Sequence, residues 1–241
     1  INLINESKKL CTIPIIASVN CYTDSEWIDF AHKIELAGAD AIELNILSVQ
    51  TSCDYKYGEF EERHIKILQD VKRNVTIPVI VKLGNNLTNP VALINQLYAN
   101  GAAGVVLFNR FYQPDIDISK MKYTTGQVLS SHGDISNTIR WIAISSAAIS
   151  NIDYAASGGI HDGEAMIKAL LAGATTVEIS STIYQHGNER IKEMLTALQA
   201  WMKEKGYERI SQFKGLMNAS EIKGIDVFER TQFLKYFGSK E

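Results

Sequence analysis

A pattern centred on glycine occurs three times along the chain, and each copy leads directly into a short apolar run. The copies are LAGA at 36–39, ANGA at 99–102 and LAGA at 171–174. The three runs end on polar residues, which are Asn45, Asn109 and Ser180. Such a repeat is typical of βα units, in which glycine ends a helix in the left-handed conformation and a strand follows. We therefore expect these polar residues at equivalent positions, at one end of a parallel sheet.

Six apolar runs qualify as strands, with amphipathic stretches between them. The runs are 13–19, 41–44, 78–82, 104–108, 153–156 and 176–179. Their near-continuous hydrophobicity indicates burial on both faces, as in a parallel sheet covered by helices. The 241 residues approach the size of a (β/α)₈ TIM barrel, which takes about 250, so we predict a single α/β domain over 1–241. A doubly wound sheet shows the same alternation and stays open as an alternative.

The predicted helices have readable ends. Side chains that accept hydrogen bonds from a first helical turn precede three of them, and a glycine follows each. The predicted N-caps are Asp24, Asn89 and Asp162, and the predicted stops are Gly38, Gly101 and Gly173.

Composition excludes several classes of function. The formal net charge of −3 provides no basic surface for nucleic acid or an acidic membrane, and no apolar run reaches the roughly 20 residues of a membrane span. Three cysteines without CxxC spacing favour reduced thiols in the cytoplasm. Five scattered histidines lack the spacing of a metal site, so no metal is predicted.

A diglycine marks the turn from the fifth run into the next helix. Ser157, Gly158 and Gly159 stand there, and Ser180 and Ser181 end the following run. Adjacent glycines let the backbone approach a phosphate, and barrels bind phosphates at the loops after their last two strands. A tight turn that requires positive φ is the alternative reading, so this pattern does not identify a ligand.

Lys82 ends the run PVIVK, where its ammonium leaves the predicted core. A solvated lysine is one reading. The other is a cation under a flavin ring, where it stabilises negative charge at N1 and C2=O of the reduced flavin. Asn45 and Asn109 are likewise either caps of strand-end backbone or hydrogen-bond partners of a flat heterocycle.

Several segments, in this order and spacing, resemble the flavin-binding segments of the dihydroorotate dehydrogenase family. These are IELN at 42–45, PVIVKL at 78–83, SGGI at 157–160 and AGA at 172–174. The tail at 205–215 resembles the closing helix of the family. The run LFNRFYQPDID at 107–117 is similar to a subgroup called dihydroorotate dehydrogenase-like.

The resemblance implies FMN as the cofactor and assigns roles to the matched residues. Asn45, Lys82 and Asn109 would line the flavin ring, with Lys82 also a catalytic candidate. The phosphate would be held by the residues of the two polar turns, which are Ser157, Gly158, Gly159, Ser180 and Ser181.

Departures from the family pattern fall on the substrate side. Active dehydrogenases usually continue after the first asparagine with Ser-Cys-Pro-Asn or Ser-Ser-Pro-Asn, whereas this chain reads LSVQ at 47–50. Ser48 matches the proton-removing base of the serine-using class. Gln50 occupies the position of the substrate-binding asparagine. Arg110, next to the substrate candidate Asn109, replaces the usual Ser or Thr. It offers a bidentate carboxylate site or pairs with Asp115 or Asp117.

The family begins with two further strands, and this chain starts just before the third. We therefore expect an N-terminally incomplete barrel, open to solvent on one side and with little bound flavin. Family members are often dimers, so a homodimer is a candidate assembly.

Three functions remain open at this stage. The first is an FMN-dependent oxidoreductase that oxidises dihydroorotate or a related small acid, in pyrimidine biosynthesis by resemblance. The second is a flavin-binding relative without that activity. The third is a flavin-free, phosphate-binding barrel isomerase or lyase.

Overall fold

The computed structural model describes residues 1–220, and residues 221–241 of the predicted domain lie outside the described part. Its strands are β1 (Ile16–Val19), β2 (Ala41–Ile46), β3 (Val79–Gly84), β4 (Gly104–Asn109), β5 (Pro114–Asp117), β6 (Lys122–Thr125), β7 (Asp153–Ser157) and β8 (Thr176–Glu178). Its α-helices are α1 (Asn2–Leu10), α2 (Asp24–Leu36), α3 (Glu59–Lys72), α4 (Pro90–Ala99), α5 (Ile135–Ala148), α6 (Gly163–Ala172), α7 (Ser181–His186) and α8 (Glu189–Lys205). Two 3₁₀ turns follow β6 and α8, at His132–Asp134 and Ile210–Gln212.

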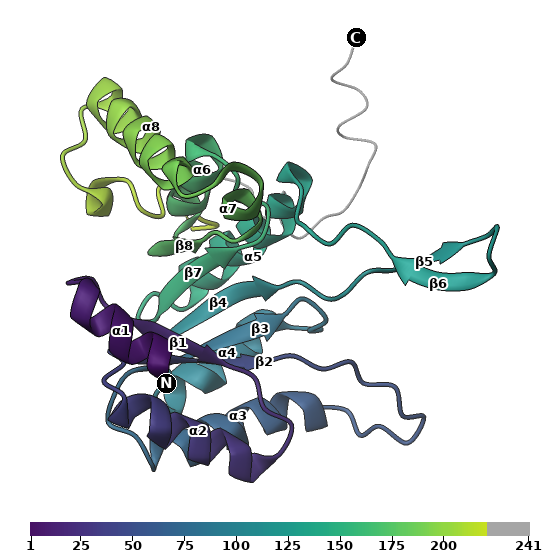
Figure 1. Cartoon of the computed structure of the whole chain (residues 1–241). Coiled ribbons are helices and arrows are strands. Elements are labelled where there is room, and N and C mark those ends of the chain that lie inside the picture. The colour runs from purple at the N-terminus through teal and green to yellow at the C-terminus, as the bar shows by residue number, and fades with distance from the viewer. Residues whose placement is uncertain (221–241) are drawn as a thin grey trace.

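Six strands form one parallel sheet in the order β1-β2-β3-β4-β7-β8, as the glycine repeat predicts. The sheet is curled, and helices pack along its outer side (Figure 1). In the described part of the chain, β1 and β8 form the two edges of this sheet. A curled parallel sheet with strands in sequential order is the geometry of a TIM barrel with six of its eight strands. The predicted fold class is confirmed.

The two faces of the sheet differ in chemistry. Side chains on the helix-facing side are apolar and fully buried, among them Ile42, Leu44 and Val81. Glu43 and Lys82, which alternate with them, point to the inner side. Because successive side chains of a strand face opposite ways, the apolar set holds the helices and leaves polar positions for the interior.

The predicted rim is also confirmed. Five of the six strands begin within one residue of the prediction, while β1 begins three residues later. Asn45 pairs with Lys82 across β2 and β3, and Gly84 pairs with Asn109 across β3 and β4. In a parallel sheet all carboxyl ends share one edge, so these side chains stand beside the turns after β7 and β8.

Two predicted N-caps are correct and one is wrong. Asn89 accepts a hydrogen bond from the amide of Ala92, and Asp162 accepts one from Ala165. The cap of α2 is Thr23 rather than Asp24, since Thr23 forms a capping box with Glu26. This box satisfies two backbone N–H groups at once, whereas Asp24 is the first residue of the helix.

Thr23→Ala is expected to lower the free energy of unfolding by about 1 kcal/mol, because it removes the hydroxyl half of the capping box. Thr51→Ala, in an exposed loop, is the matched control and leaves stability unchanged. Urea denaturation of both variants tests this. Equal stabilities would show that the capping box contributes nothing.

The β5–β6 hairpin was not predicted. It projects away from the curled sheet (Figure 1), and its strand residues are almost all exposed. Its sequence does alternate apolar and polar residues, as PDIDI at 114–118 and MKYT at 121–124, so a strand signal was present and was overlooked.

The tail was predicted to resemble a closing helix, and this is wrong for most of its length. Helix α8 ends at Lys205 because Gly206 adopts the left-handed conformation, with φ of 76°. Phe213 is fully buried beyond it, with its ring centroid 5.0 Å from that of Trp201 and 5.3 Å from that of Tyr207. This aromatic cluster and the backbone bonds from Gly215 and Met217 to α6 hold the tail in place of helical turns. Across the described residues, no helix has the length and apolarity that a bilayer crossing requires.

Candidate functional site

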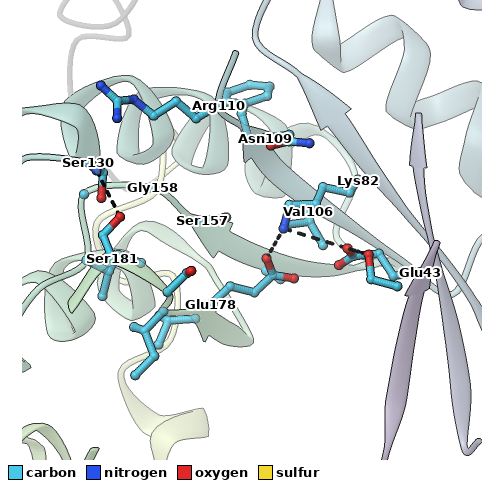
Figure 2. Close-up of a pocket in the computed structure, with 18 of the residues that line it drawn as sticks. Glu43, Lys82, Val106, Asn109, Arg110, Ser130, Ser157, Gly158, Glu178 and Ser181 are labelled. Atoms are coloured by element: carbon cyan, nitrogen blue, oxygen red, sulfur yellow. Dashed lines mark hydrogen bonds and ion pairs between the residues drawn. The ribbon is translucent and has the colours of Figure 1, made fainter. Parts of the chain in front are cut away.

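A cavity of about 720 Å³ lies on the inner side of the sheet and reaches its carboxyl edge (Figure 2). Inward-facing strand residues form its floor, and the turns after β7 and β8 form one wall. The lining includes Ser18, Glu43, Lys82, Asn109, Ser157, Gly158, Gly159, Glu178, Ser180 and Ser181. Cofactor pockets of proteins generally measure about 300–1,000 Å³. The cavity thus unites most of the predicted site residues.

The two glycines of the diglycine turn have different roles. Gly158 has φ of 94° and Gly159 has φ of 75°, both in the left-handed region that favours glycine. A Cβ on Gly159 would lie 2.2 Å from the backbone nitrogen of Ile135, so this glycine permits close packing against α5. A Cβ on Gly158 would meet no atom within 4 Å. The backbone at Gly158 is therefore open to the cavity, whereas the backbone at Gly159 is covered by α5.

Hydrogen bonds from Ser130 connect the segment after the diglycine turn to the turn after β8. The backbone N–H of Ser130 donates to the hydroxyl of Ser181 at 2.9 Å, and the Ser130 hydroxyl lies 3.1 Å from Nε2 of His161. Burial, followed by the nearby charge of His132, holds the pKa of His161 below its usual value. A neutral imidazole accordingly links Ser130 to the glycine turn at neutral pH. The Ser181 hydroxyl accepts a bond here, which leaves its own hydrogen available to a ligand.

Lys82 stands at the centre of the floor, between two carboxylates (Figure 2). Its Nζ is 2.5 Å from Oε2 of Glu178 and 3.8 Å from Oε1 of Glu43. The hydroxyl of Ser18 also donates to Glu43, at 2.6 Å. The predicted cation is thus present in the cavity, as an ion pair rather than as a free or solvated ammonium.

The two predicted amides meet directly. Nδ2 of Asn109 donates to Oδ1 of Asn45 at 2.6 Å, so the pair bridges β2 and β4 on the two sides of Lys82. Asn109 lines the cavity. Each amide keeps further donor or acceptor positions for a bound ring.

The predicted substrate residues divide into two groups. Ser48 and Gln50 line neither this cavity nor the neighbouring one of about 390 Å³. The Ser48 hydroxyl accepts a hydrogen bond from the side-chain amide of Gln50 at 2.9 Å. An amide group is not a base, so this contact does not activate the hydroxyl. Arg110, in contrast, lines both cavities and donates to the carbonyl of Val128 at 2.9 Å. In the described residues its partner is neither Asp115 nor Asp117.

Sequence reasoning missed Glu43, Glu178 and Ser130. Both glutamates stand two residues before a predicted site residue, Asn45 and Ser180, and both lie within runs that were predicted as strands. Since residues two apart share a face of a strand, that spacing was a usable signal. Ser130 lies in a loop far from Ser181 in sequence, and no local pattern identifies it. In the described part of the chain, no group of three or more His, Cys, Asp or Glu residues is arranged to hold a metal ion.

Comparison with known proteins identifies the class to which this barrel and its cavity belong. The family model of dihydroorotate dehydrogenase matches residues 1–202. This is most of the chain, and the chain belongs to the dihydroorotate dehydrogenase family of oxidoreductases.

Three relatives illustrate the match. The catalytic subunit of dihydroorotate dehydrogenase B (NAD(+)) from Thermoplasma volcanium is 29% identical, over 90% of this chain and 71% of the relative. Subunit PreA of the NAD-dependent dihydropyrimidine dehydrogenase of Escherichia coli (strain K12) is 24% identical, over 88% of this chain and 55% of the relative. A putative dihydroorotate dehydrogenase A (fumarate) from Aeropyrum pernix is 26% identical, over 85% and 67%. The chain spans between about half and seven tenths of these relatives.

The residues present fit a flavin, the cofactor of this family. One end of the cavity offers a cation and the amide of Asn109, groups that hydrogen-bond a polar heterocycle, while Asn45 lies outside the lining and bonds to Asn109. The other end offers open backbone at Gly158 and the hydroxyl of Ser181. A single cavity connects the two ends, as a ligand with a ring and a distant phosphate requires.

Proposed function

We propose that this chain is the FMN-binding barrel of an oxidoreductase that acts on a CH–CH bond of a small cyclic acid. The observation that supports this most strongly is the continuous cavity from Lys82 to Gly158 and Ser181, in a chain of this family. A bound FMN would supply hydride acceptance, which no protein side chain provides.

The phosphate end is proposed to comprise Ser157, Gly158, Gly159, Ser180 and Ser181. Backbone N–H groups approach an anion closely at Gly158 because no Cβ intervenes. The Ser181 hydroxyl is fixed by its bond from Ser130 and donates its hydrogen outward. Gly159 contributes through packing, since its Cβ position is occupied by α5.

The ring end is proposed to comprise Lys82, Asn45 and Asn109. The amide pair fixes both side chains in orientation and presents hydrogen-bonding edges to a planar ligand. The strand-borne side chains hold these positions more rigidly than loop residues would.

The substrate is proposed to be a small acid held by Arg110, whose guanidinium borders both cavities. One N–H group of the Arg110 guanidinium donates to the carbonyl of Val128, and the remaining N–H groups are available to a carboxylate. Dihydroorotate and related dihydropyrimidines are the substrate class favoured by the names of the relatives, which would place the protein in pyrimidine metabolism.

Two further proposals concern assembly and location. A homodimer is the proposed oligomer, by family resemblance. All three cysteines are unpaired, in keeping with the cytoplasm as the proposed compartment.

The cofactor is tested by purifying the full-length protein and identifying what denaturation releases. We expect a yellow protein that releases one FMN per chain. A colourless protein that does not take up added FMN would favour the flavin-free isomerase or lyase. A yellow protein that oxidises no dihydropyrimidine or related acid would favour the flavin-binding relative without this activity.

Gly158→Val is expected to weaken FMN binding at least about tenfold, since hydrogen bonds to a charged phosphate contribute about 1.5–3 kcal/mol each. Gly206→Val is the matched control, because Gly206 has φ of 76° and equally open surroundings but does not line the cavity. Fluorescence titration with FMN measures both. Equal affinities in the two variants would contradict the phosphate assignment.

A further inference from the structure

The floor of the cavity contains three ionisable side chains in mutual contact. Glu43 extends from β2, Lys82 from β3 and Glu178 from β8 (Figure 2). The side chain of Glu43 is 7% exposed, that of Lys82 17% and that of Glu178 32%. Glu43 is thus the deepest of the three, and Glu178 is the nearest to solvent.

Charge counting shows that these groups do not all ionise easily. Two carboxylates and one ammonium leave an excess negative charge in a largely buried place, which is costly. Burial, followed by the hydrogen bond and charge of Glu178, raises the pKa of Glu43 to about 7. Ser18 and Lys82 act in the opposite direction. The remaining strands contribute uncharged neighbours to the cavity, among them Val106 and Ala155, and Arg110, which follows β4, is a further charged side chain in its lining.

We propose that Glu43 and Glu178 share one proton and together neutralise Lys82, and that Glu178 thereby sets the charge that Lys82 presents to a ring bound above it. The proposed effect of Glu178 on a bound ring rests on the proposed FMN site. With the proton shared, one negative charge balances the ammonium, and the floor is electrically neutral. Glu178 has the larger effect on a ring because it is closest to Lys82 and most exposed to the cavity.

This arrangement changes what the lysine does. A free ammonium favours negative charge on a ligand beside it, whereas an ammonium paired at 2.5 Å has most of its field cancelled. Glu178 is therefore a positioning residue. It holds Nζ toward the floor and lowers the preference of the site for a negatively charged ring.

The first test does not require flavin. In full-length protein with ¹³C-labelled glutamate carboxyl groups, NMR should show one glutamate that titrates near neutral pH. Glu43→Gln should abolish that titration. Glu178→Gln should weaken the proton affinity of Glu43 at least about tenfold, because a like charge and a hydrogen-bond partner are removed. Lys82→Met should move the same titration to higher pH.

Glu204→Gln, which removes an exposed acid on α8, is the control and leaves the titration unchanged. If every glutamate of the wild-type protein titrates at its ordinary acidic pH, no proton is shared and the proposal is overturned. A neutral-pH titration that survives Glu43→Gln overturns it equally.

The second test uses the FMN-loaded protein. Glu178→Gln should make the midpoint potential of the bound flavin more positive, and Glu204→Gln should leave it unchanged. An unchanged potential in Glu178→Gln would refute the influence of Glu178 on the ring. If the protein binds no FMN while the glutamate titration is present, the proposed function fails and the shared proton stands.

Discussion

Dihydroorotate is expected to reduce the flavin of the loaded full-length protein at least about 100-fold more slowly than the flavin of an authentic dihydroorotate dehydrogenase. Proton removal from carbon requires a base close to the substrate, and a misplacement of about 1 Å costs on the order of 100-fold in rate. Ser48, the residue in the position of that base, lines neither cavity, and its hydroxyl is bonded to Gln50. A hydroxyl without a proton acceptor is a poor base.

Rapid mixing with dihydroorotate, monitored by flavin bleaching, measures this rate. A variant with Val49→Pro and Gln50→Asn restores the usual family residues of the loop and keeps Arg110, and we expect it to bleach at least about tenfold faster than the wild type. Fast, saturable bleaching by the wild-type protein would show that the interpretation of Ser48, Gln50 and Arg110 is wrong.

Gly159→Ala is expected to lower the free energy of unfolding by about 3–5 kcal/mol, and Gly158→Ala by only about 1–2 kcal/mol. Both replacements place a side chain at positive φ. Only at Gly159 would the new Cβ also collide with backbone, at 2.2 Å from the nitrogen of Ile135, and backbone does not yield as a flexible side chain does.

Urea denaturation gives the two free energies, and an unchanged slope would confirm that the unfolded states are alike. Similar losses in the two variants would mean that the diglycine turn is not packed against α5 as described. This pair also separates the structural glycine from the ligand-facing one, which the sequence alone presents as equivalent.

The strands and the polar rim could be predicted because both depend on local patterns. The recurring glycine fixes where each helix ends, and apolar runs of similar length follow it. Asn45, Lys82 and Asn109 then come together because parallel strands share a carboxyl edge. No knowledge of distant contacts is needed for that conclusion.

Most features that were missed depend on long-range contacts. Lys82 pairs with Glu178, which is 96 residues away in sequence, and Ser130 meets Ser181 at a separation of 51. The choice of Thr23 over Asp24 as a cap depends on the reciprocal contact with Glu26. The β5–β6 hairpin is exposed, and its short alternating runs, PDIDI at 114–118 and MKYT at 121–124, were overlooked.

The most direct test of the central claim is a crystal structure of the full-length protein grown with FMN. We expect one FMN in the cavity, with its phosphate about 3 Å from the backbone nitrogen of Gly158 and from the hydroxyl of Ser181, and with its ring beside Lys82 and the Asn45–Asn109 pair. FMN bound elsewhere, or a cavity that stays empty at saturating FMN, would contradict the claim.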